Sequence, residues 1–296
     1  MIRKKLMCGM LALTMFGCDA ANEQPANTDT AVNEPNEGKA MKKMKDIPKS
    51  TWIWNAYALD TSILSDLKKQ HVKKVYIQIE TELSIEDYAP FIRAANKKGI
   101  DIYALAGEST WATNRKQARA TMAWIEQAQQ QTQLFTGVHL DVEPYTLKSY
   151  STKKQPILEN YFEVLKEYRK MTNSYNMRLE ADIPFWYDEE LYENRYGQGK
   201  VSDFVIRVTD EVAIMAYRQK AQDIIDITAH ERNYAKKKGK TLTIAVETHP
   251  SETEPQVSFA NSTVANFEKQ VETVHAKTNM PVGIHFLDSW RSLYDQ

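Results

Sequence analysis

Residues 136–143 carry polar side chains at alternate positions, with valine or leucine between them. His139, Asp141 and Glu143 form the polar set. Alternate side chains of an extended strand point to the same face, so Asp141 and Glu143 would lie about 6.6–7 Å apart along it. Two such carboxylates resist ionising together, which raises one pKa and leaves a group able to donate a proton to a leaving oxygen. The spacing therefore indicates acid–base chemistry.

Short β-rich stretches and amphipathic helices alternate around this run. The strand-like stretches are Thr51–Tyr57, Val72–Glu80, Ile100–Ala106, Thr136–Glu143, Arg178–Pro184, Glu211–Tyr217, Leu242–Glu247 and Val282–Leu287. The helical patterns are Thr61–Gln70, Ser84–Lys98, Arg115–Gln131, Lys154–Met171, Asp223–Lys238 and Asn266–Thr278. Gly99 and Gly239 follow two of these helices, as expected where a helix ends. Between 187 and 210, a loop and a short helix near Val201–Val208 must serve as the fifth crossover.

Strands that alternate with helices predict a parallel sheet. Eight such strands within residues 49–296 fit the roughly 250 residues typical of a (β/α)8 barrel. The sequence has no G-x-G-x-x-G after its first strand and no P-loop, which disfavours an open nucleotide-binding sheet. We therefore predict an α/β fold, a single (β/α)8 TIM barrel over 49–296.

Helices cover the outside of such a barrel, so the polar residues of the fourth strand would face its axis. The same alternation places further polar side chains inside: Tyr76, Gln78, Glu80, Arg178, Glu180, Asp182, Glu211, Tyr217, Thr243 and Glu247. We expect the deeper ones to form a closed network in which Arg178 neutralises Glu180 or Asp141. Barrel active sites lie where the strands end. The groups predicted to lie at that end are Glu80, Glu143, Asp182, Tyr217 and Glu247.

Five of the six tryptophans lie in the first strand or just after other strands. Flat indole faces stack on sugar rings, and carboxylates hydrogen-bond sugar hydroxyls, so the combination favours a carbohydrate ligand. The predicted substrate-binding residues are Trp52, Trp54, Glu80, Trp111, Asp182, Trp186 and Trp290. We expect the long loops 185–200 and 248–263 to set the substrate. No cofactor is implied.

The stretch Phe135-Thr136-Gly137-Val138-His139-Leu140-Asp141-Val142-Glu143 resembles the fourth-strand signature of family-18 chitinases and related barrel glycosidases. Ile214-Met215-Ala216-Tyr217 resembles their sixth-strand element, and Trp290 falls near their eighth-strand tryptophan. The resemblance implies that Glu143 is the general acid and Asp141 its partner. It also implies that Tyr217 orients a substrate carbonyl and that Trp290 forms the floor under a sugar. In substrate-assisted hydrolysis the acetamide of the sugar is the nucleophile.

The sequence departs from that signature at three positions. His139 and Thr136 stand where the family has aspartate, and Arg218 replaces an acid or amide after the tyrosine. A second interpretation is therefore a different barrel glycosidase, with Glu143 as acid/base and Glu247, at the end of the seventh strand, as its partner. Such enzymes usually have asparagine where Val142 stands. Both interpretations require Glu143.

Two further classes remain open. His139, Asp141 and Glu143, with His249 or His285, could supply nitrogen and oxygen ligands to a metal in a hydrolase. The chain has no HExxH motif, and we prefer a hydrogen-bonded interior role for His139 and no metal. Alternatively, a lipid-tethered protein could bind carbohydrate without hydrolysing it, which His139 and Arg218 would allow.

Both cysteines, Cys8 and Cys18, lie near the amino terminus, and the formal net charge is −1. That charge argues against nucleic-acid binding. A basic head and a short apolar run predict a signal peptide over residues 1–17. The polar stretch 18–48 predicts a disordered tether. Met15-Phe16-Gly17-Cys18 resembles a bacterial lipobox, which implies lipidation of Cys18.

Together these features predict a membrane-tethered glycoside hydrolase of the bacterial envelope. Its expected partners are an extracytoplasmic glycan and the membrane that holds the lipid on Cys18. The barrel itself is expected to be monomeric.

Overall fold

The computed structural model describes residues 42–295. The predicted signal peptide, most of the predicted tether and the predicted lipidation site Cys18 lie outside the described residues. Within the described part, no helix combines the length and apolar character needed to cross a bilayer.

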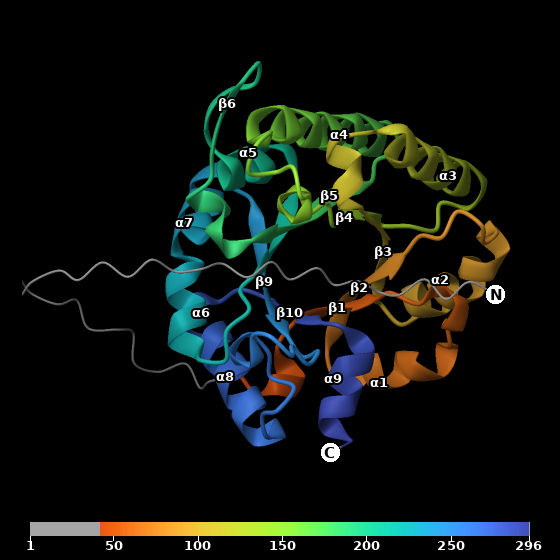
Figure 1. Cartoon of the computed structure of the whole chain (residues 1–296). Helices are drawn as coiled ribbons and strands as arrows, with labels where there is room; N and C mark the ends of the chain where they lie inside the picture. Colours follow the sequence, from red (N-terminus) through yellow and green to blue (C-terminus); the bar gives the residue numbers. More distant parts are fainter. Residues whose placement is uncertain (1–41, 296) are drawn as a thin grey trace, which may run out of the picture. The chain divides into compact units, whose positions relative to one another are not determined.

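Eight parallel strands close into a barrel in the order β1-β10-β9-β8-β5-β4-β3-β2 (Figure 1). The strands are β1 Lys49–Ile53, β2 Val72–Gln78, β3 Asp101–Ala106, β4 Gly137–Leu140, β5 Arg178–Pro184, β8 Glu211–Met215, β9 Thr241–Glu247 and β10 Val282–His285. The predicted fold class is confirmed. We call the end where the strands finish the mouth and the end where they begin the base.

Helices surround the barrel and connect each strand to the next (Figure 1). They are α1 Leu64–Lys69, α2 Ile85–Lys97, α3 Lys116–Thr132, α4 Lys154–Ser174, α5 Val201–Val208, α6 Ala221–Ile227, α7 Ala229–Lys238, α8 Val264–Thr278 and α9 Leu287–Tyr294. The short helix expected near Val201–Val208 is α5, so it supplies the fifth crossover. Glycine or asparagine in the left-handed conformation ends α7 and α8, which satisfies their last carbonyl groups.

Three local features differ from the sequence prediction. The expected loop 187–200 contains an antiparallel hairpin, β6 Leu191–Asn194 and β7 Gly197–Lys200. The single helix expected over 223–238 is two helices, because the Thr228 hydroxyl bonds the carbonyl groups of Ile224 and Ile225 where they meet. The eighth strand ends at His285, and the residues after it form α9.

Apolar side chains form two separate cores, as the alternation along the strands predicts. Outward residues such as Val138 and Leu140 belong to the large core between barrel and helices. A smaller core lies inside the barrel: Trp52, Tyr76, Tyr103, Leu105, Ala213 and Ala245. Trp52 fits there because Gly283 opposes it, where an added Cβ would lie 2.7 Å from the indole.

Candidate active site

The chain turns out of the barrel immediately after β4, and this turn places Asp141 and Glu143. Asp141 passes so close to Gly107, which follows β3, that a Cβ on Gly107 would lie 2.0 Å from the Asp141 carbonyl oxygen. Only glycine permits that approach. Asp141 and Glu143 thus follow β4 in irregular backbone, although the sequence pattern predicts strand as far as Glu143.

Three acidic side chains, Asp141, Glu143 and Asp182, lie close enough at the mouth to influence one another; we call them the upper carboxylates. Burial raises the pKa of Asp141 well above its usual range, and the charges of Glu143 and Asp182 raise it further. Asp141 Oδ1 has no hydrogen-bond partner among the described residues. The raised pKa favours the protonated form of Asp141, and its Oδ1 is available to bind a ligand.

Glu143 lies beside Tyr145, which together with Trp186 forms what we call the aromatic wall of the mouth. Burial raises its pKa, the hydroxyl of Tyr145 opposes the rise by donating a hydrogen bond to Oε1, and Asp182 adds to it. The Tyr145 ring in turn contacts Trp186, with centroids 4.9 Å apart. A carboxyl group with a raised pKa beside aromatic side chains is suited to donate a proton to a bound glycoside.

Asp182, on β5, accepts two contacts from inside the barrel. Trp52 Nε1 donates to Asp182 Oδ2 over 3.1 Å, and His139 Nε2 lies 2.8 Å from the same oxygen. Burial lowers the pKa of His139, but the carboxylates of Asp182 and Glu180 more than offset this and raise it to about 9. His139 is therefore an imidazolium at neutral pH, which agrees with the interior role predicted for it.

A second hydrogen-bonded chain crosses the mouth through Glu247 and His285. Glu247 Oε1 accepts from the backbone N–H groups of Thr248 and His249, at 2.7 and 2.6 Å. His285 Nδ1 lies 2.7 Å from Glu247 Oε2, and Trp54 Nε1 donates to His285 Nε2 over 3.1 Å. The indole can only donate, so Nε2 is the acceptor and Nδ1 carries the hydrogen. Both oxygens of Glu247 are thus engaged.

Tyr217, which follows β8, lies near both hydrogen-bonded groups of the mouth, the one around Asp182 and the one around Glu247. Its ring stacks on His285 with centroids 6.0 Å apart. Burial raises the pKa of its hydroxyl well above the usual value, and Glu247, Asp182 and Asp141 raise it further. The structure therefore brings together Asp141, Glu143, Asp182, Tyr217 and Glu247, as the sequence predicts.

Deeper in the barrel lies a paired group of three charged residues, Lys74, Glu180 and Glu211, which we call the lower cluster. Lys74 Nζ is 2.8 Å from Glu180 and 2.7 Å from Glu211. Burial alone would raise the pKa of Glu180, but hydrogen bonding from His139 and the charge of Lys74 lower it to about 2. Arg178, the expected neutralising residue, forms ion pairs with both carboxylates at 3.6 Å, so the predicted pairing with Glu180 is present. Lys74, which the sequence prediction did not include, is the closer cation.

Several predicted sugar-binding residues are packed in the protein and are not exposed in the mouth. Trp111 is 2% exposed and stacks on Tyr168 of α4, and Trp290 lies on α9 in the outer core at 4% exposure. Trp52 is 1% exposed inside the barrel, so its role is to hold Asp182. Glu80 follows β2, where its backbone N–H contacts the Tyr88 hydroxyl. Trp54 donates to His285 and Trp186 contacts Tyr145, and both are less deeply buried than Trp52.

Sequence reasoning missed two residues that shape the mouth. Tyr145 lies two positions beyond Glu143, and His285 was considered only as a metal ligand. Among residues 42–295, no group of three or more His, Cys, Asp or Glu side chains is arranged to hold a metal ion.

No protein-family model matches the chain, and no curated protein sequence matches it. Solved structures share its fold. A chitinase from Chromobacterium violaceum matches 84% of this chain and 98% of its own, with TM-score 0.51 and 11% identity. The spore cortex-lytic enzyme SleL of Bacillus megaterium matches 84% of this chain and 73% of its own, with TM-score 0.51 and 8% identity. The chain spans 63% of the matched domain of an Ostrinia furnacalis Group II chitinase, at 15% identity and TM-score 0.45. The protein thus has the TIM-barrel fold of these glycoside hydrolases.

Proposed function

We propose that the protein hydrolyses glycosidic bonds in a polysaccharide or envelope glycan. The observation that carries the proposal is the raised pKa of Glu143 near Asp141, whose Oδ1 has no hydrogen-bond partner within residues 42–295, at the mouth of a barrel of this fold. Perturbed carboxyl groups at the mouth of a barrel are typical of acid catalysis. The names of the similar structures, chitinases and a cortex-lytic enzyme, support a glycan substrate.

In the proposed reaction, Glu143 donates its proton to the glycosidic oxygen. The bond from that oxygen to the anomeric carbon breaks, the leaving sugar takes the proton, and positive charge develops on the ring. In a sugar that carries an acetamide, Asp141 orients this group, and its carbonyl oxygen bonds to the anomeric carbon to give a cyclic oxazolinium ion. Water then attacks the anomeric carbon, the bond to the acetamide oxygen breaks, and the water gives its proton to Glu143.

Glu247 is better suited to positioning than to nucleophilic attack. Its two oxygens already accept from two backbone N–H groups and from His285, so attack on a sugar would require breaking these bonds. Asp141 Oδ1, by contrast, accepts no hydrogen bond from the described residues. We therefore favour Asp141 over Glu247 as the partner of Glu143.

The test is hydrolysis of chitin oligosaccharides and peptidoglycan strands by the full chain and by Glu143→Gln. We expect the variant to lose about 10²–10⁴-fold in rate, the usual contribution of a general acid. The control is Glu82→Gln, which alters an exposed glutamate of the loop after β2 and should leave the rate unchanged. Full activity in Glu143→Gln would overturn the proposal.

Binding without hydrolysis is the second candidate, because a cation lies deep in the mouth. The imidazolium of His139 stands where the resemblance implies an aspartate, and Arg218 points its guanidinium at the Tyr217 carbonyl and the Phe185 ring. If the parent binds these glycans without cleaving them, and Glu143→Gln binds equally well, this candidate replaces the first.

We also propose that Cys18 carries lipid and tethers the protein outside the cytoplasm. The support is the lipobox-like Met15–Cys18 followed by a polar stretch. Incorporation of a labelled fatty acid should be lost in Cys18→Ala and retained in Cys8→Ala. If Cys18→Ala still incorporated the labelled fatty acid, Cys18 would not be the residue that carries the lipid.

A further inference from the structure

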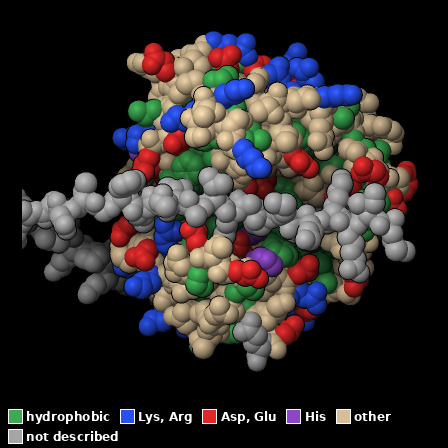
Figure 2. Space-filling view, in the orientation of Figure 1, with side chains coloured by type: hydrophobic (Ala, Val, Ile, Leu, Met, Phe, Trp, Pro, Cys, Tyr) green, Lys and Arg blue, Asp and Glu red, His purple; other side chains and the backbone are tan. Residues whose placement is uncertain are grey.

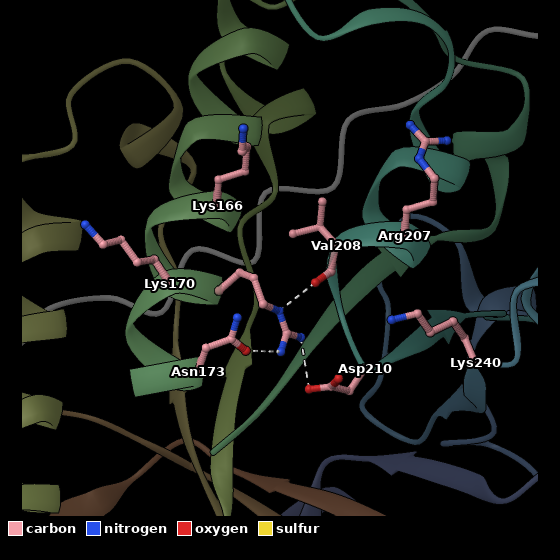
Figure 3. A pocket seen from close by; sticks show the side chains of 8 residues that line it. Lys166, Lys170, Asn173, Arg207, Val208, Asp210 and Lys240 are labelled. Carbon is pink, nitrogen blue, oxygen red and sulfur yellow. Dashed lines mark hydrogen bonds and ion pairs between the residues drawn. The ribbon is translucent and has the colours of Figure 1, made fainter. Parts of the chain in front are cut away.

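A cleft of about 500 Å³ lies toward the base, outside the barrel. Its walls come from the later part of α4, the end of α5 and the starts of β8 and β9. We call it the basic cleft, and its lining residues are Lys166, Arg169, Lys170, Asn173, Arg207, Val208, Asp210 and Lys240. Figure 3 shows Lys166 and Lys170 on one side, with Arg207 and Lys240 across from them. Asp210 is the one acid in the lining.

The basic cleft contains more cationic side chains than are engaged in ion pairs or in hydrogen bonds to backbone carbonyl groups. Arg169 neutralises Asp210 at 2.9 Å and also donates to the Val208 carbonyl, and Lys240 donates to the Thr209 carbonyl. These two cations satisfy backbone at the ends of helices, where cations are favourable in any case. Lys170 forms no ion pair within residues 42–295, and neither does Lys166, which lies over the Tyr196 ring. At least two charges therefore remain for a ligand.

The same charge continues across the base. Exposed lysines in or beside the connections that lead into the strands are Lys42, Lys43, Lys45, Lys69, Lys73, Lys97, Lys236, Lys237 and Lys277. Acids there are fewer, and Asp66 is already paired with Lys69. The loops of the mouth carry the acids Glu82, Glu108, Asp188, Glu189, Glu252 and Glu254, and lysines such as Lys116, Lys148 and Lys153 lie in or beside them. Lysine therefore predominates at the base, whereas the mouth holds both signs of charge. In the face shown in Figure 2, acidic side chains lie near the middle and Lys and Arg gather over α4.

We propose that the base, centred on the basic cleft, docks on an anionic membrane surface by contacting phosphodiester head groups. Lysine predominates over arginine and the charges are spread over a broad area, which suits a diffuse charged surface better than bidentate recognition of one phosphate. The described chain also begins at the base, because Lys42–Pro48 leads into β1 and Met44 N donates to Glu272 of α8. Docking in this way turns the mouth away from the bilayer, toward a glycan.

The experiment uses the full chain carrying Cys18→Ala, so that no lipid on that residue holds it to a membrane. Sedimentation measures its partition onto vesicles of phosphatidylglycerol with phosphatidylcholine, and onto phosphatidylcholine alone. We expect binding to the anionic vesicles that weakens as salt is added. Binding by the basic head and apolar run near the amino terminus is the same in every variant that shares them, so the contribution of the base is taken from the difference between the variants below.

Two matched variants separate the base from total charge. Lys166→Gln/Lys170→Gln/Lys237→Gln neutralises the base, and the partition coefficient should fall between tenfold and about a hundredfold, from the usual contribution per lysine. Lys116→Gln/Lys148→Gln/Lys153→Gln removes the same charge around the mouth and should change it less than twofold.

Equal losses in the two variants, or equal binding to both kinds of vesicle, would overturn the proposal. If a soluble phosphodiester polymer abolishes vesicle binding at matched phosphate concentration, a soluble polyanion is the ligand instead of a membrane. The measurement needs no hydrolysis, so it stands even if the proposal for Glu143 fails.

Discussion

Two groups of carboxylates lie inside the same barrel, and the pKa shifts found in one group are opposite in direction to those found in the other. In the lower cluster, Lys74 bridges Glu180 and Glu211, and the pKa of Glu180 falls to about 2. Among the upper carboxylates, the pKa values of Asp141 and Glu143 are raised instead. Glu180 is buried whereas Asp141 and Glu143 are only partly buried, so burial does not explain why the pKa of Glu180 is the one that is lowered.

The difference lies in where the cations are. Lys74 enters the barrel from β2 near the base, and His139 reaches up only as far as Asp182. Beyond His139 no lysine or arginine of the described residues forms an ion pair with Asp141 or Glu143. The lower cluster is therefore charged and structural, whereas the raised pKa values of Asp141 and Glu143 favour their protonated forms. Removing single members of each group tests this contrast.

The largest effect is expected from Lys74→Met. Without the lysine, Glu180 and Glu211 become buried carboxylates that face each other without their main cation, which typically costs about 3–5 kcal/mol. Urea denaturation followed by circular dichroism measures the free energy of unfolding. Lys73→Met is the control, because Lys73 is exposed, and should change it by less than about 0.5 kcal/mol. A loss below about 1 kcal/mol in Lys74→Met would mean that the lower cluster is not structural.

Asp141→Asn should separate catalysis from stability. We expect the hydrolysis rate to fall roughly 10²-fold, since the amide cannot act as the carboxyl does, while the free energy of unfolding stays equal or rises. Asp141 has no cation to lose, and burial penalises its charge. Glu180→Gln should do the reverse and lower stability more than the rate measured on the folded fraction.

The rate of hydrolysis by Glu247→Gln, measured in the same assay, tests whether Asp141 or Glu247 is the partner of Glu143. We expect a smaller loss of rate than in Asp141→Asn, because Glu247 positions His285 and does not attack the sugar. A severe loss in Glu247→Gln with little effect of Asp141→Asn would assign the reaction to a pair of glutamates.

The smallest effect is a shift of the pH profile in Tyr145→Phe. Hydrolysis needs protonated Glu143, so the rate falls as pH rises through the pKa of Glu143. The Tyr145 hydroxyl stabilises the ionised carboxylate and lowers that pKa. Without the hydroxyl the pKa rises, and the falling limb of kcat/KM should move up by about one pH unit.

The matched control for that shift is Tyr187→Phe. The Tyr187 ring lies 6.0 Å from that of Tyr145, but its buried hydroxyl has no hydrogen-bond partner among the described residues. Removing the Tyr187 hydroxyl should leave the falling limb of kcat/KM at the same pH. An unchanged limb in Tyr145→Phe, or a shift to lower pH, would show that Glu143 is not the titrating acid.

Much of the mouth was predictable because strand side chains alternate. Asp182 and Glu247 lie on strands and follow from that rule, which would also have identified Lys74, on the same face of β2 as Tyr76. Asp141, Glu143 and Tyr217 were predicted by extending the rule past the points where β4 and β8 end. Trp290 could not be placed in this way, because the eighth strand ends at His285 and a helix carries the tryptophan into the outer core.

The sequence by itself determined the barrel, its eight strands and the inward set of polar side chains, since these depend on local periodicity. Only the tertiary structure decided which carboxylates are paired. Lys74 meets Glu180 across the barrel, Trp52 crosses over Gly283 to reach Asp182, and Asp141 passes against Gly107. Each of these contacts joins residues far apart in the chain. The pKa of a carboxyl group depends on burial and on charges within a few ångströms, so the chemistry of the mouth is fixed by these contacts.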